Sequence, residues 1–323
     1  MRLVFLMISL IIASCGVIDQ KESVEPTDTD TLWDMYEQKT KRALELRDSQ
    51  TGWLAGDDCD GMIWAGKYGS ALGIDGVDIF AASFDDEPGR FGRRPLYEDG
   101  EYQGRCWSEE GDTGSSTTWS RDMGSAGLLP YCWVNKRLDI LQLHADYGRA
   151  LNWVMGQPIG DGRVIYTPNV IGLLYELIYA LGGQNSANRL WPSYWPGGLD
   201  DYEAHIQSMM IWLQGEAAAT IGDMDAVPRQ GARLTGISGT MFDRLEEHYS
   251  REPESPWYTY LYHLYSDGDM GPVTKMLIDH PYRHATYVRC SSQEECVLAE
   301  WLFVASRVLE RSKDDRYHNT GSD

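Results

Sequence analysis

Basic residues are scarce in this chain compared with acidic ones. Its 323 residues include 28 Lys and Arg against 49 Asp and Glu, so the formal net charge is −21. Proteins that bind nucleic acids through the phosphates need clusters of basic side chains. Docking onto an anionic lipid surface by charge alone needs the same clusters. We therefore expect neither kind of partner.

Long hydrophobic runs and several common motifs are also absent. The apolar run at residues 3–12 is about ten residues long, roughly half of what a membrane-spanning helix needs. The sequence contains no C-x-x-C, no G-x-S-x-G, no phosphate-binding loop and no dinucleotide fingerprint. His280 and His284 are four residues apart but lack the Glu of the metalloprotease pattern. We expect no metal and no cofactor.

The first residues carry the features of an export signal. One Arg precedes the apolar run, which ends in Ile12-Ala13-Ser14-Cys15. This segment resembles the bacterial lipobox, which implies a signal peptide at 1–14 and a lipid, with palmitate among its acyl chains, on Cys15. Gly16 in place of Asp implies the outer membrane rather than the inner one. The alternative is a secretory signal with a chance Cys at the cleavage site.

The rest of the chain divides into a tether, a body and a tail. Residues 15–30 are polar and lack an apolar period, which indicates a flexible tether. Residues 31–311 form the predicted domain, and 312–323 a polar tail. We expect a lipid-anchored protein of the bacterial cell envelope that faces the periplasm or the exterior.

The remaining cysteines fit an oxidising compartment. Cys290 and Cys296 lie six positions apart in a polar loop and can form a local disulfide. Cys59 and Cys106 flank polar segments and can pair with each other. Cys132 lies in an apolar run and is predicted to be a buried free thiol.

Helical periodicity dominates the body and predicts a single all-α domain of about ten helices. A long Gly-rich loop at 75–114 separates the second helix from the third, and short strands are expected only near 90–97 and 163–166. The pattern fits either an irregular helical bundle or an α/α toroid, in which helix hairpins surround a central cavity, and we favour the toroid. The predicted helices are 32–46, 59–72, 118–134 with a bend at Pro130, 138–155, 168–181, 200–221, 231–249, 257–265, 271–278 and 294–309.

Two acidic residues at helix starts are the candidate catalytic pair. Asp122 is on the helix face that continues inward to Trp133, and Asp60 begins a second helix with Trp64 one turn later. If both helix starts meet at one rim, the two carboxylates face a cleft lined by Trp64, Trp119 and Trp133. Two acids that flank a bond are what glycoside hydrolysis requires.

The segment Trp119-Ser120-Arg121-Asp122 resembles segments of α/α-toroid carbohydrate-active families, such as glucoamylase-like and unsaturated-glycuronyl hydrolases. The resemblance covers four residues and the general helical layout. It implies a catalytic Asp122 and an Arg121 that holds the substrate. Asp60 has no such support and rests on its predicted position.

Structural roles compete with these assignments. Asp122 and Asp60 also suit helix starts because carboxylates stabilise the positive end of a helix and cap its N–H groups. Arg121 and Asp122 can form a structural ion pair. His205 lies beside the apolar stripe of its helix, where it either faces a substrate cavity or forms part of the core.

We therefore predict an exported lipoprotein that binds and cleaves a glycan or peptidoglycan, as a glycoside hydrolase or polysaccharide lyase. The alternative is a non-catalytic lipoprotein that binds carbohydrate or protein, or assists assembly of the envelope. An enzyme requires the Asp60 and Asp122 carboxylates to lie about 5–10 Å apart.

Overall fold

The computed structural model describes residues 27–49, 51–54, 61–73, 89, 91, 123–159, 162–165, 168–184, 201–223, 226–228, 237–281 and 293–313. In these ranges the protein is all-α, as predicted, apart from one small β-hairpin. The helices are α1 (Asp28–Leu46), α2 (Gly61–Leu72), the π-helix η1 (Met123–Leu128), α3 (Leu129–Val134), α4 (Leu138–Ala150), α5 (Pro168–Ala180), α6 (Asp201–Ile221), α7 (Ile237–Arg251), α8 (Pro256–Tyr265), α9 (Gly271–Asp279) and α10 (Gln293–Ser312).

The first helix begins earlier than its apolar pattern indicates. Thr27 is the N-cap, and its hydroxyl accepts a hydrogen bond from the Asp30 N–H at 3.2 Å. The Asp30 carboxylate accepts one in return from the Thr27 N–H at 3.0 Å. This reciprocal capping box satisfies N–H groups that the helix itself leaves unpaired. It therefore adds a turn to α1 before Leu32.

The bend predicted at Pro130 is a change of helix type. The chain runs as a π-helix through η1 and continues as α3, with Pro130 in the first turn of α3. Proline has no N–H, so Pro130 cannot continue the hydrogen-bond series of the preceding π-helix.

The helix predicted at 138–155 was too long. It ends at Ala150, and Asn152 and Trp153 have positive φ values of 51° and 61°. A Cβ on Gly148 would lie 2.5 Å from a carbon of the Trp153 ring, so the ring folds back onto that glycine. The chain then forms an antiparallel hairpin of β1 (Val154–Ile159) and β2 (Gly162–Ile165). The predicted strand at 163–166 overlaps β2, whereas most of 90–97 lies outside the described residues.

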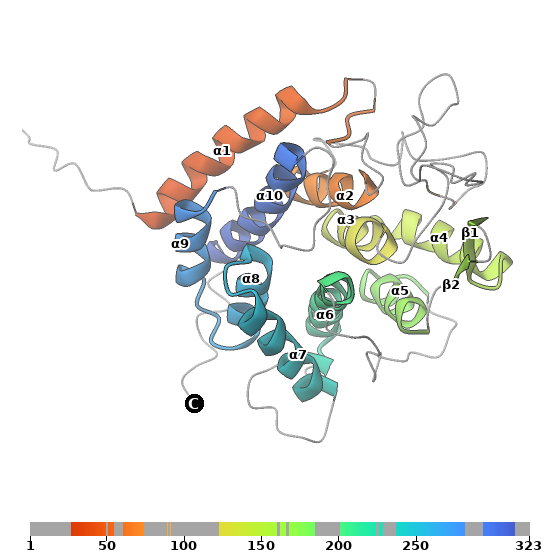
Figure 1. Ribbon diagram of the computed structural model, residues 1–323. Coiled ribbons are helices and arrows are strands. Elements are labelled where there is room, and N and C mark those ends of the chain that lie inside the picture. The colour runs from red at the N-terminus through yellow and green to blue at the C-terminus, as the bar shows by residue number, and fades with distance from the viewer. Residues whose placement is uncertain are drawn as a thin grey trace, which may run out of the picture.

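Five elements contact one another in a closed cycle, which we call the ring: α2, η1 with α3, α6, α8 and α10 (Figure 1). Each packs against the next, and α10 returns to α2. The helices α1, α4, α5, α7 and α9 pack around the outside of the ring (Figure 1).

All helices of the ring run in the same direction. For each pair of neighbouring helices given below, two contacts can be compared. The later residue of one helix contacts the later residue of the other, which is the pattern of parallel helices. Taken around the ring, these contacts are Met62–Gly127 and Gly69–Asn135, Lys67–Glu300 and Ser70–Arg307, Trp257–Phe303 and Tyr260–Arg311, and Ser208–Trp257 and Trp212–Tyr265. The carboxyl ends of these helices therefore lie at one end of the ring.

Tryptophan fills much of the space between the helices. The indoles of Trp212 and Trp257 meet edge to face with ring centroids 5.7 Å apart, and Trp212 meets Phe303 in the same way at 5.4 Å. Edge-to-face pairs of this kind add about 0.5–1.5 kcal/mol beyond area burial. Within the described ranges, no helix combines the length and apolar character needed to cross a bilayer.

A buried histidine makes stability depend on pH. Burial, and then the charges of Arg251 and Arg244, lower the pKa of His248 from 6.5 to about 4. The unfolded chain therefore binds a proton between pH 6.5 and pH 4 that the folded chain does not, so stability falls as pH falls through this range. At pH 5 the loss is about 2 kcal/mol.

His248→Phe removes the titrating group and retains a ring to stack on Tyr258, 5.4 Å away. We expect its free energy of unfolding to fall less between pH 7 and pH 5 than that of the wild type, by about 2 kcal/mol. Urea unfolding at both pH values measures this difference. An unchanged pH dependence contradicts the assignment.

Candidate functional site

The predicted site residues divide into two groups. Those within the described residues are Trp64, Trp133, His205 and Cys296. Both predicted acids and the predicted lipidated cysteine lie outside these residues, so the separation of the acids and the position of the cysteine stay predictions. The residues that lie outside the described ranges are Asp60, Asp122, Arg121, Trp119, Cys15, Cys59, Cys106 and Cys290.

The helices that follow the two acids are in direct contact. Gly61 begins α2 and Met123 begins η1, and these parallel helices approach so closely that their backbones touch. An ideal Cβ on Gly66 would lie 2.6 Å from the carbonyl carbon of Gly127. The first residues of both helices therefore lie at the same end of the ring.

Charged and polar side chains are buried inside the ring. The Lys67 ammonium donates to the Glu300 carboxylate at 2.6 Å, and the two side chains are 0% and 1% exposed. The ammonium also lies 5.0 Å from the centroid of the Trp64 ring. We call Lys67, Glu300, Trp64 and His205 the interior cluster.

His205 approaches this cluster from α6. Burial, and then the charge of Lys67, hold the pKa of its imidazole well below the usual value. A neutral imidazole has one nitrogen that accepts a proton or hydrogen bond. His205 and Trp64 are both buried side chains in the structure. Their predicted contact with a substrate stays a prediction.

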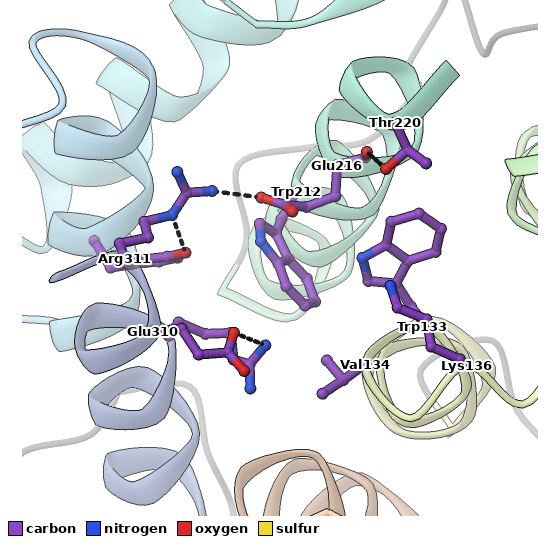
Figure 2. A pocket seen from close by; sticks show the side chains of 10 residues that line it. Trp133, Val134, Lys136, Trp212, Glu216, Thr220, Glu310 and Arg311 are labelled. Carbon is purple, nitrogen blue, oxygen red and sulfur yellow. Dashed lines mark hydrogen bonds and ion pairs between the residues drawn. The ribbon is translucent and has the colours of Figure 1, made fainter. Parts of the chain in front are cut away.

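A cavity of about 240 Å³ lies at the carboxyl ends of the ring helices, and we call it the end cavity (Figure 2). Trp133 lines it together with residues of α6, α8 and α10, and not with Trp64. Arg307 comes seven positions after Glu300 on α10, which corresponds to about 10 Å along the helix axis. Its lining consists of Trp133, Val134, Lys136, Trp212, Glu216, Thr220, Tyr260, Arg307, Glu310 and Arg311.

Two carboxylates of the end cavity are each held by a guanidinium. Arg311 donates to Glu216 at 2.7 Å and to the Tyr260 hydroxyl at 3.2 Å. Arg307 pairs with Glu310 at 2.7 Å. The oxygens of both carboxylates thus serve to position arginines. Sequence reasoning did not single out these residues; the Arg-x-x-Glu-Arg run in the last turns of α10 was the available signal.

Lys136 differs from the other cations of the end cavity. Its ammonium lies 4.4 Å above the Trp133 ring, and in the described part of the chain no carboxylate lies within 4.0 Å of it. The residue is exposed; partial burial lowers the pKa of its ammonium, and the charges of Glu216 and Glu310 act in the opposite direction. Its φ is 56°, because it follows α3 in the left-handed conformation, with the Arg137 N–H donating back to the Cys132 carbonyl at 2.9 Å.

The described cysteines differ in state. Cys132 is a buried free thiol, as predicted, and burial raises its pKa. Cys296 is disulfide-bonded. Its bonding partner is not among the described residues, so the pairings Cys290–Cys296 and Cys59–Cys106 stay predictions.

No resident ion is indicated where side chains are described. Among these residues, no three His, Cys, Asp or Glu side chains gather in a way that could hold a metal. The chain matches no protein-family model, no curated protein and no solved structure in the comparisons made.

Proposed function

We propose that this protein is a lipid-anchored enzyme of the bacterial envelope that cleaves a glycan with Asp60 and Asp122 as its acid pair. The observation that supports this is the parallel packing of α2 on η1. Asp60 and Asp122 directly precede these helices in the sequence, and the helices start at the same end of the ring. Two carboxylates about 5–10 Å apart can act as proton donor and as base or nucleophile.

We further propose that the ring is the inner layer of an α/α toroid. Support comes from its closed cycle of parallel helices and from the five helices packed around it. In this proposal Trp64 follows Asp60 by one helical turn, Arg121 holds the substrate as the resemblance implies, and Trp119 lines the cleft. The neutral imidazole of His205 is then an acceptor for a sugar hydroxyl.

The anchor is the second part of the proposal. A lipid on Cys15 holds the body at the membrane through the polar segment 15–30. A flexible tether of that length has a mean span of about 20 Å. Envelope polysaccharide or peptidoglycan therefore lies within reach.

A second candidate is a non-catalytic carbohydrate-binding lipoprotein. The end cavity favours it because two indoles and a phenol line a small polar space, and flat aromatic faces with polar edges suit sugar rings. The two carboxylates there already bind guanidiniums, which suits binding better than proton transfer.

Asparagine variants of the two acids test the enzyme. We expect Asp122→Asn and Asp60→Asn each to reduce glycan turnover by about a hundredfold, because each removes a proton-transfer group. The measurement is a hydrolysis screen on envelope polysaccharides, with circular dichroism to verify the fold. Asp139→Asn is the control, since this exposed carboxylate binds Arg137 on the outer helix α4.

Two results contradict the enzyme. Unchanged turnover by a folded Asp122→Asn variant removes the proposed role of this residue. A wild-type protein that binds glycans on an array without cleaving any of them favours the second candidate instead.

A further inference from the structure

We propose that the end cavity binds a small organic anion, a carboxylate or phosphate group on a molecule of about monosaccharide size, through Lys136. This site is separate from the proposed acid pair, which precedes the opposite ends of α2 and η1. The inference therefore does not depend on the proposed function.

The cavity suits a small ligand with a flat face. Its volume is about 240 Å³, below the roughly 300 Å³ at which pockets for drug-sized molecules begin. Figure 2 shows the Trp212 indole between the Arg311 side and the Trp133 side of the cavity. Aromatic surfaces on two sides leave room for one ring or a short chain.

The charges of the lining indicate an anion. The lining contains three cationic side chains and two carboxylates. Each carboxylate lies 2.7 Å from a guanidinium and also attracts the Lys136 ammonium, so the lining as a whole carries one surplus positive charge. The neighbour of this ammonium is the face of Trp133, which takes none of its three N–H donors in a conventional hydrogen bond. Lys136 is an exposed residue, so water solvates its ammonium in the free protein, and a bound anion replaces that water.

Two further donors belong to the same lining. The Nε1 of Trp212 is buried and has no hydrogen-bond acceptor within the described residues. The Tyr260 hydroxyl accepts from Arg311 and retains its own hydrogen to donate. A buried donor without an acceptor costs about 1–3 kcal/mol. The Tyr260 hydroxyl can therefore donate to an anion held by Lys136, whereas the Trp212 Nε1 is fully covered and the indole must shift to reach the same anion.

The backbone at Lys136 supports a role in binding. A left-handed residue after a helix is usually glycine, because a side chain there costs energy. Strain of this kind concentrates at functional sites. A cation that only compensated the negative end of α3 would serve equally well from the last turn of that helix. Position 136 is the one that places the ammonium over Trp133 in the cavity.

Calorimetric titration of the full chain with gluconate, glucose 6-phosphate and glucose tests the inference. We expect at least one of the two anions to bind, and glucose to bind at least about tenfold more weakly. Lys136→Gln should weaken anion binding about tenfold. The control is Lys313→Gln, because Lys313 lies 4.2 Å above the Trp33 ring, outside the end cavity. The Lys313→Gln variant should bind the anions as tightly as the wild type.

The stability of a second variant separates binding from structure. Lys136→Gly should melt at or above the wild-type temperature, because glycine suits the positive φ, and should still lose anion affinity. A lower melting temperature with anion affinity retained overturns the inference and gives Lys136 a structural role.

Binding of gluconate alone or of glucose 6-phosphate alone supports the site and identifies its anionic group. Equal binding of glucose, unchanged binding by Lys136→Gln, or no binding of any probe overturns it. If the wild type binds none of the anions but Asp122→Asn loses glycan turnover, only the inference about the end cavity is overturned, and the proposed function is supported.

Discussion

Lys67→Met is expected to lower the free energy of unfolding by about 3–5 kcal/mol. The Glu300 carboxylate is 1% exposed and lies 2.6 Å from the Lys67 ammonium, so the variant removes its cation and leaves it buried. Methionine has a similar length and fills most of the lysine volume, which limits the contribution of a new cavity. Urea unfolding at pH 7 measures the loss.

An exposed ion pair on α1 and α10 is the matched control. Arg42 and Glu294 lie 2.9 Å apart, with side chains 48% and 61% exposed, so Arg42→Met should cost less than about 1 kcal/mol. The double variant Lys67→Met with Glu300→Leu should recover most of the loss, because no buried charge remains. If Lys67→Met costs no more than Arg42→Met, the buried pair does not stabilise the ring.

The sequence could not predict this pair. The helix α2 has an apolar stripe through Met62, Ile63 and Tyr68. A lysine close to this stripe is expected to reach solvent, because lysine is rarely fully buried unless it has a partner. That partner is on α10, 233 positions later. Periodicity reports which face of a helix is buried but not which distant side chain meets it.

Helix positions were predictable to a much greater degree than helix ends. The apolar spacing that placed α5, α6, α8, α9 and α10 within a few residues depends on burial of one face, which each helix shows by itself. The ends depend on individual contacts. The Thr27–Asp30 capping box begins α1, and the Trp153 ring on Gly148 ends α4 before the hairpin.

At the candidate site, too, features of a single helix were predictable and contacts between distant helices were not. Trp133 was predicted to line a cleft and does line a cavity, but its neighbours there come from α6, α8 and α10. The close spacing of Arg307 and Glu310 is visible in the sequence. Their part in a cavity is not visible, because it arises only in the folded chain, where side chains of α10 and α6 meet across the end cavity.

Gly66→Ala is expected to destabilise the fold by about 3 kcal/mol, although alanine favours an isolated helix by about 1 kcal/mol. Its Cβ would lie 2.6 Å from both the carbonyl carbon and the Cα of Gly127, and backbone atoms cannot rotate away. The reverse change meets the same obstacle, because a Cβ on Gly127 would lie 2.5 Å from the Met62 carbonyl oxygen. Either variant must move α2 away from η1.

Gly215→Ala on α6 is the control for this close approach. Its Cβ would lie 2.7 Å from Cζ of Tyr265, a side-chain end that can shift when its hydrogen bond to the Trp212 carbonyl is given up. We expect a cost of about 1 kcal/mol. Denaturant midpoints compare the variants. Equal losses of stability in Gly66→Ala and Gly215→Ala would mean that the backbones of α2 and η1 are not in contact. The proposed acid pair depends on that contact, because it brings the first residues of the two helices to the same end of the ring.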